Sequence, residues 1–201
     1  MQRVGILGGS FNPVHLGHLV IAEQARQQAN LDRVLWLPNG QPPHKQLAPG
    51  ASSADRWQMV NLAIATTDQF SASDLEITRP GYSYAVDTLT HLRQTQPDIH
   101  WHWIIGADAL KDLPQWHRAS ELAGLCDWIV APRLDNLSTI MANITQTLAL
   151  KSQTLEMPVL DLSSTLIREF VAQGRSIRYL VPETIATYIQ THQLYRQPSS
   201  P

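Results

Sequence analysis

The sequence contains a single cysteine, no long apolar run and almost no net charge. Each of these features argues against a class of protein. Its 201 residues include one cysteine, Cys126, which can form neither an internal disulfide nor a thiolate metal cluster and is expected to be an inert core residue. No segment approaches the roughly 18 consecutive apolar residues of a membrane-spanning helix. The first residues, MQRVGIL, lack the apolar core of a signal peptide. We therefore expect a soluble protein of the reducing cytoplasm.

The charge balance bears on the partners of the protein. There are 15 basic and 17 acidic residues, and the formal net charge of -2 gives no reason to expect nucleic acid as a ligand. A small phosphorylated ligand stays open, because it needs only a local cluster of donors. The length fits one domain, expected at residues 1–196, followed by a flexible tail at 197–201. A homo-oligomer is left open.

Short apolar runs alternate with helical patterns along the chain. Strands are expected at residues 4–7, 34–37, 75–77, 101–105, 128–131 and 159–162. Helices are expected at residues 16–30, 54–65 with Ser53 as N-cap, 85–97, 137–148, 163–173 and from Pro182 onward.

This alternation predicts the fold and the place of the site. It is typical of a parallel sheet with helices on both faces, so we predict an α/β, Rossmann-like, doubly wound fold. Residues 4–7 are an unbroken apolar run that two glycines end, which predicts the central strand. Ligands of such sheets bind beyond the carboxyl ends of the strands. The loops at 8–18, 38–45, 106–108 and 162–168 all leave those ends.

Residues 8–18, GGSFNPVHLGH, form the first candidate phosphate site. Glycines let the backbone approach phosphate oxygens, and the helix that follows adds free N–H groups and the positive end of its dipole. His15 and His18 are three residues apart and so share a helix face. A glycine pair alone often only tightens a turn, but its combination with HLGH is more specific. The spacing fits neither a zinc motif nor a P-loop, where lysine would replace His18.

Residues 163–168, SSTLIR, form the second candidate. A hydroxyl run at a helix start usually caps the helix. Arg168, however, lies one turn after Ser164 and Thr165, so its guanidinium can join their hydroxyls on one oxyanion. Together the two segments would bracket a polyphosphate.

Other polar and aromatic residues are open to two interpretations. His44 and Lys45, in a proline-braced loop, fit either a cationic clamp or a solvated loop. Trp116 fits either stacking on a ligand ring or partly buried packing. His100 and His102 alternate along a strand start, where exposed edge residues are favoured over a metal pair.

The motifs resemble those of a known family. Residues 8–18 and 163–168 resemble the two signatures of the (T/H)xGH nucleotidylyltransferases. Between and after them lie PNGQPPHK from residue 38, Arg56 with Met59, EITRPGYSY from 76, DTL from 87, IGAD from 105, LPQW from 113 and YLVP from 179. Over about residues 3–190, this series is similar to bacterial nicotinate-nucleotide adenylyltransferases.

The resemblance implies transfer of AMP from ATP to nicotinate mononucleotide, giving deamido-NAD and pyrophosphate, with Mg²⁺ bound through the ATP phosphates and no metal held by the protein itself. It implies four catalytic residues: His15, His18, Lys45 and Arg168. It implies that ATP is bound by Gly8, Gly9, Ser10, Phe11, His15, His18, Gly106, Asp108, Ser164, Thr165 and Arg168. The acceptor would be bound by Asn39, His44, Lys45, Tyr84, Thr88 and Trp116.

Departures from the family pattern are few. Asn12 stands where many bacterial members have aspartate, which is expected to be harmless if the residue only forms the turn, and Ala85 replaces a common threonine. Two alternatives stay open. One is nicotinamide mononucleotide or another phosphorylated acceptor as substrate, and the other is a non-catalytic adenine-nucleotide sensor.

Overall fold

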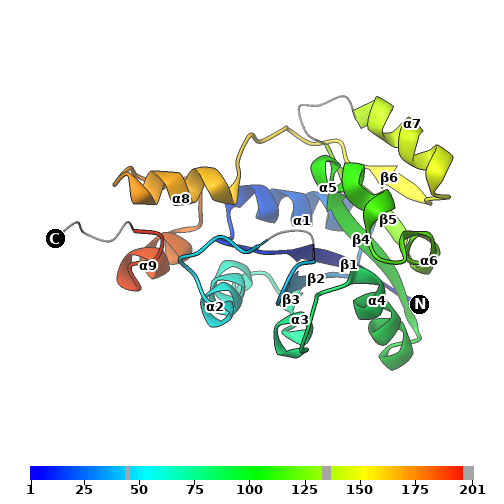
Figure 1. Cartoon of the computed structure of the whole chain (residues 1–201), viewed down its shortest axis with the longest axis horizontal. Coiled ribbons are helices and arrows are strands. Elements are labelled where there is room, and N and C mark those ends of the chain that lie inside the picture. The colour runs from blue at the N-terminus through cyan, green and yellow to red at the C-terminus, as the bar shows by residue number, and fades with distance from the viewer. Residues whose placement is uncertain (44–45, 133–136, 197–201) are drawn as a thin grey trace.

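A six-stranded parallel sheet runs through the described residues, 1–43, 46–132 and 137–196, of a computed structural model (Figure 1). Its order is β3-β2-β1-β4-β5-β6, formed by β1 (Gln2–Gly9), β2 (Arg33–Pro38), β3 (Phe70–Ala72), β4 (Ile99–Gly106), β5 (Asp127–Ala131) and β6 (Ser152–Thr154). The predicted Rossmann-like α/β class is confirmed. β1 lies between β2 and β4, the central place that its unbroken apolar run predicts.

Helices pack on both faces of the sheet and divide the core into two layers. One layer contains residues of α1 (Leu16–Gln28), α2 (Ser53–Ile64), α8 (Ser164–Ala172) and α9 (Glu183–Thr191). The other contains residues of α4 (Ala85–Thr95), α5 (Ala107–Asp112), the 3₁₀ turn η1 (Leu113–Gln115), α6 (Ala119–Leu125) and α7 (Leu137–Thr147). Alternate residues of β1 serve the two layers, because Val4 and Ile6 join the second and Leu7 the first.

The register of the strands brings the site loops together. Gly9 at the end of β1 pairs with Pro38 at the end of β2, and Leu7 pairs with Ile104 of β4. The backbone N–H of Asn39 then donates to the carbonyl of Gly9 at 2.9 Å. The loops after β1, β2 and β4 therefore begin side by side, at the switch point where the strand order reverses.

Two predicted strands are wrong. Residues 75–77 lie in a short helix, α3 (Leu75–Thr78), and the edge strand is β3, several residues earlier. Residues 159–162 form no strand, and β6 instead consists of the exposed polar residues Ser152–Thr154. As an edge strand, β6 pairs only with β5 and buries no apolar face, so its sequence carries no apolar pattern.

Two local expectations also need correction. The N-cap of α2 is Ser52, not Ser53: the Asp55 N–H donates to Ser52 Oγ, and the Ser52 N–H donates back to Asp55 Oδ2, a capping box. His100 and His102 are not on an edge strand, since β4 lies between β1 and β5. His102 is only 2 % exposed, and burial, together with the charges of Arg3 and His100, lowers its pKa to about 4.

Among the described residues, no helix combines the length and apolar character needed to cross a bilayer. The predicted tail, residues 197–201, lies outside the described residues.

Candidate active site

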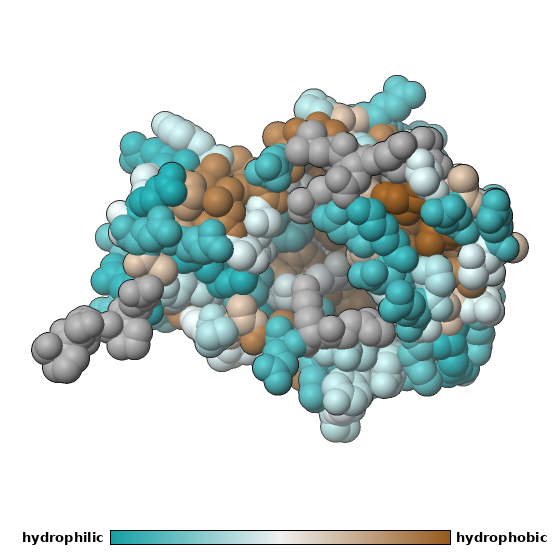
Figure 2. Space-filling view, turned by 45° about the horizontal axis from the view of Figure 1, so that its top comes forward, coloured by the Kyte–Doolittle hydropathy of each residue, from teal (hydrophilic) through white to brown (hydrophobic). Residues whose placement is uncertain are grey.

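A cavity of about 650 Å³ opens at the carboxyl edge of the sheet, between the loops after β1, β2 and β4 and the start of α8. Figure 2 shows the surface hollowed near the centre of its view. Most residues expected in the site line this cavity, namely Gly8, Gly9, Ser10, His15, His18, Asn39, Tyr84, Gly106, Asp108, Trp116, Ser164, Thr165 and Arg168. The structure thus brings together residues from both ends of the sequence. His44 and Lys45 lie outside the described residues.

The two histidines of residues 8–18 form a stacked pair at the start of α1. His15 is the N-cap, and its ring centroid lies 3.6 Å from that of His18, with 27° between the ring planes. The backbone N–H of His15 donates to Nδ1 of His18 at 3.2 Å. Because Nδ1 accepts, a neutral His18 ring carries its proton on Nε2. Glycine between them leaves room for this stacking, since a Cβ on Gly17 would lie 3.0 Å from Nδ1 of His15 and would force its ring to shift.

Phe11 packs on the core side of the turn after β1 and does not line the cavity. It is buried, and its backbone adopts a left-handed conformation with φ of 46°, which is unusual for a bulky residue. Its ring contacts those of His18 and Trp36, at centroid distances of 5.0 and 5.3 Å. Its place in the structure is therefore beneath the His18 ring, in the apolar core.

The start of α8 is hydrogen-bonded directly to the turn after β1. The Ser164 hydroxyl donates to the carbonyl of Pro13 at 2.9 Å. Nη1 of Arg168 donates to the carbonyl of Asn12 at 2.8 Å, and its Nη2 donates to Thr165 Oγ1 at 3.1 Å. These bonds hold the start of α8 against Asn12 and Pro13 of the turn after β1. The Arg168 guanidinium and the Thr165 hydroxyl thereby lie on the cavity lining beside a helix N-terminus, a combination that suits phosphate.

Arg56 supports the site from within the core. In the sequence, only the family resemblance drew attention to this residue. Its guanidinium is fully buried; Nη1 donates to the carbonyl of Ser10 at 2.9 Å, and Nη2 donates to that of Gly40 at 3.4 Å. Burial lowers its pKa. Arg56 thereby joins the turn after β1 to the loop after β2. A signal existed, because an arginine shares the inward helix face with Met59 and Val60.

Thr88 does not line the cavity. Its buried hydroxyl donates to Oε1 of Glu76 at 2.7 Å and accepts from Nη2 of Arg79 at 2.9 Å. Glu76 does line the cavity and is 5 % exposed, and its pKa is raised by burial, against the lowering effects of Thr88 and Arg79. Thr88 therefore reaches the cavity only through Glu76. The sequence did contain a sign that Glu76 is buried, because its carboxylate lies between the apolar residues Leu75 and Ile77.

Aromatic residues form a second part of the cavity lining, apart from the residues at the start of α8. Tyr84 and His117 lie with their ring centroids 4.3 Å apart, and both line the cavity with Trp116. His117 was missed from the sequence, although it directly follows Trp116. Oδ1 of Asn39, which also lines the cavity, is buried and has no hydrogen-bond partner within the described part of the chain. Such an acceptor is suited to a donor group on a ligand.

The fold and this cavity define a class of nucleotidyltransferase, and comparison with known proteins agrees: residues 6–170 match the family described as cytidylyltransferase-like. A probable nicotinate-nucleotide adenylyltransferase of Synechococcus sp. (strain JA-3-3Ab) is 56% identical over 199 residues, 98% of this chain and 96% of that protein. One of Gloeobacter violaceus is 46% identical over 202 residues, 98% of each chain. The chain belongs to the nicotinate-nucleotide adenylyltransferase family, as the resemblance predicted.

A solved structure shows the same fold. The Plasmodium falciparum nicotinic acid mononucleotide adenylyltransferase complexed with NaAD matches with a TM-score of 0.82. The match covers 97% of this chain and 98% of that one, at 18% identity. At this identity the likeness establishes the arrangement of the elements, which is the Rossmann-like sheet described above.

Proposed function

We propose that this chain transfers the AMP group of ATP to the phosphate of nicotinate mononucleotide, releasing pyrophosphate and forming nicotinate adenine dinucleotide, also called deamido-NAD. The observation that carries the proposal is the direct bonding of Arg168 and Ser164 to the turn at Asn12 and Pro13, in a cavity that aromatic residues also line. The first group of residues suits a polyphosphate and the second a flat ring. The names of the relatives, which are nicotinate-nucleotide adenylyltransferases, support the same reaction.

The phosphates of ATP lie against the turn after β1 and the start of α8. His15 and His18 face the α-phosphate, while Ser164, Thr165 and Arg168 hold the β- and γ-phosphates. The backbone of Gly8, Gly9 and Ser10 approaches the nucleotide closely, and Gly106 and Asp108 receive its adenosine portion. Lys45 has the role on the phosphates that the resemblance implies, and His44 has its implied role on the acceptor; both lie outside the described residues.

The reaction is an in-line displacement at the α-phosphorus. An oxygen of the acceptor phosphate forms the new P–O bond, and the bond to the pyrophosphate oxygen breaks with its electron pair. The attacking phosphate is already ionised at neutral pH, so no strong general base is required. This chain contributes position and charge stabilisation, through His18 and Arg168 above all. No covalent enzyme intermediate forms.

Mg²⁺ enters as the complex with ATP and belongs to the substrate. The cavity is compatible with it, because its lining includes the carboxylates of Asp108 and Asp112, and carboxylate oxygens are ligands that Mg²⁺ accepts. When bound, the ion neutralises charge on the phosphates.

The acceptor nucleotide occupies the aromatic part of the cavity. Trp116 stacks on the pyridine ring and Tyr84 lies beside it, while the buried acceptor Oδ1 of Asn39 suits a hydroxyl of the nucleotide and not its carboxylate. Thr88 contributes by holding Glu76 in place rather than by touching the ligand. The single cysteine, Cys126, is buried, and its burial raises the pKa of the thiol to about 12, as expected of an inert core residue. We infer a cytoplasmic location from the sequence, which has no second cysteine for a disulfide.

A pyrophosphate-release assay with the acid and amide mononucleotides side by side tests the acceptor. We expect turnover with nicotinate mononucleotide and much less with nicotinamide mononucleotide; equal use of both would contradict the acid-specific proposal. The same assay with His18→Ala tests the chemistry, for which we expect a loss on the order of 10² to 10³ in rate. ATP binding without any pyrophosphate release would instead favour the nucleotide sensor.

A further inference from the structure

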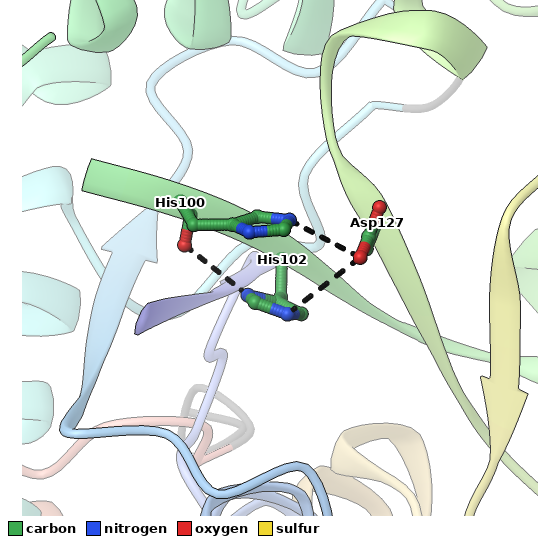
Figure 3. A group of neighbouring side chains, drawn as sticks. All are labelled: His100, His102 and Asp127. Carbon is green, nitrogen blue, oxygen red and sulfur yellow. Dashed lines mark hydrogen bonds and ion pairs between the residues drawn. The ribbon is translucent and has the colours of Figure 1, made fainter. Parts of the chain in front are cut away.

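A cluster of metal-ligand side chains lies at the opposite edge of the sheet from the cavity. His100 and His102 are near the start of β4, and Asp127 is the first residue of β5, directly paired with His102 in the strand register. Figure 3 shows both imidazole rings turned toward the Asp127 carboxylate. The cavity is at the other end of β4, at Gly106, so the reaction proposed above does not use this cluster.

The spacing of the three side chains is close to that of a metal site. Nε2 of His100 lies 3.1 Å from Oδ2 of Asp127, and Nε2 of His102 lies 4.0 Å from the same oxygen. The ligand atoms of all three residues lie within 4.8 Å of one another. Tetrahedral bonds of about 2.0–2.2 Å place neighbouring ligand atoms roughly 3.4 Å apart. Small side-chain rotations would therefore complete the coordination geometry.

The hydrogen bonds of His102 orient its ring for coordination. Its Nδ1 lies 3.2 Å from the backbone carbonyl of His100. A carbonyl oxygen can only accept, so Nδ1 carries the proton and the lone pair is on Nε2, the atom that faces Asp127. A histidine whose second nitrogen donates to a backbone carbonyl is the arrangement typical of metal-bound imidazole.

Cationic side chains already lie on the atoms that an ion would use. Nζ of Lys151 is 2.7 Å from Oδ2 of Asp127, and Nη2 of Arg3 is 3.1 Å from Nε2 of His102. Oδ2 of Asp127 and Nε2 of His102 therefore each already accept from a positively charged group. Lys151 has a 76 % exposed side chain on a flexible stem, so it can withdraw into solvent when another cation binds.

We propose that His100, His102 and Asp127 form a binding site for a divalent transition-metal ion of the Zn²⁺ and Co²⁺ type, with water as the fourth ligand. Two imidazoles and one carboxylate suit these ions better than Mg²⁺ or Ca²⁺, which prefer oxygen ligands alone. The ion displaces the Lys151 ammonium and turns the Arg3 guanidinium aside. Because the ligands come from β4 and β5, the bound ion stabilises the pairing of these strands.

Cobalt titration tests the site, using the whole chain without an affinity tag and after treatment with a chelator. We expect visible absorption bands of tetrahedral Co²⁺ and a rise in Tm with Co²⁺ or Zn²⁺, since an ion that binds the folded state raises its stability. His100→Gln should weaken binding at least tenfold and abolish the rise in Tm. This half-buried position is chosen because the fully buried His102 invites misfolding on substitution.

Two matched variants make the test specific. His91→Gln removes an exposed histidine of α4 and should leave Co²⁺ binding unchanged. Lys151→Ala removes the ammonium that competes for Oδ2 of Asp127 and should strengthen binding, whereas a purely internal ion-pair cluster predicts no such gain. Equal spectra for the wild type and His100→Gln would place the ion elsewhere and overturn the proposal, as would an absence of cobalt bands in the wild type at millimolar Co²⁺.

Discussion

The hydroxyl of Tyr195 donates a hydrogen bond of 2.7 Å to Oδ1 of Asn12, joining the end of the described chain to the turn after β1. Nδ2 of Asn12 donates to the carbonyl of Ala48 at 2.9 Å, and its own carbonyl accepts from Arg168. Asn12 thus connects three segments. An amide accepts from Tyr195 and also donates to Ala48, which an ionised aspartate could not do, so asparagine at this position does more than form the turn.

Substitution of Tyr195 by phenylalanine tests this connection. Burial raises the pKa of the Tyr195 hydroxyl, which therefore stays a donor over the working pH range. Tyr195→Phe leaves Oδ1 of Asn12 buried without its donor, which should lower the free energy of unfolding by about 1–3 kcal/mol. The KM for ATP should rise, because Asn12 also orients Arg168. Urea denaturation and initial rates measure the two effects.

Tyr179→Phe is the control for that experiment, since Tyr179 is 81 % exposed and lies outside the cavity. It should leave both quantities unchanged. Equal stability of Tyr195→Phe and the wild type would show that the hydrogen bond contributes nothing to the folded state.

The connections of Asn12 illustrate what sequence reasoning could reach. The turn at 8–18 and the segment at 163–168 were paired correctly because the carboxyl ends of parallel strands share one edge of a sheet. Strands buried on both faces were found from their apolar residues: residues 4–7 of β1 form an unbroken apolar run, and residues 101–105 of β4 are apolar except for His102. Tyr195, by contrast, is 183 positions from Asn12, and no periodic pattern marks such a contact.

The wrong predictions, for two strands and for Thr88, also have physical reasons. β6 is polar and on the edge, so it lacks the apolar signal that predicts a strand. The alternation in LEIT is typical of a strand, yet the segment is a helix whose Glu76 turns inward to meet Thr88. Thr88 was expected to touch the acceptor, but its hydroxyl is hydrogen-bonded to Glu76 and Arg79. Which group a buried hydroxyl meets depends on tertiary packing, and residue spacing in the sequence does not reveal it.

Replacement of Arg168 by lysine should separate charge from geometry. Lysine keeps the positive charge but cannot donate from a planar fork to the Asn12 carbonyl and Thr165 Oγ1 together with a phosphate. We expect kcat/KM for ATP to fall on the order of 10² to 10³, measured by pyrophosphate release. Arg175→Lys is the matched control, because that guanidinium lies over the Phe170 ring and away from the cavity. Comparable rates for the two lysine variants would refute the role given to Arg168.

Thr88→Val tests whether Thr88 acts on the acceptor through Glu76. Valine keeps the shape but removes the donor to Glu76 and the acceptor for Arg79, so the unfolding free energy should fall by about 1–3 kcal/mol. Thr88→Ser keeps the hydroxyl and should retain the KM for the acceptor nucleotide, whereas Thr88→Val should raise it. If Thr88→Val altered the acceptor KM in a Glu76→Gln background as strongly as in the wild type, action through Glu76 would be excluded.

Glu76→Gln predicts a change in the pH dependence of stability. Burial raises the pKa of Glu76 above its ordinary 4.5, so the folded protein favours the protonated carboxyl more than the unfolded chain does. The stabilisation from this group is therefore complete below about pH 4.5 and is lost as pH rises through the higher folded-state pKa. Relative to Glu76→Gln, which does not titrate, the wild type should become progressively less stable between these limits. Urea unfolding of both proteins from pH 4 to pH 8 measures the difference, in which the other titrating groups cancel; a difference that stayed constant, or that grew in favour of the wild type, would mean that the folded-state pKa is not raised.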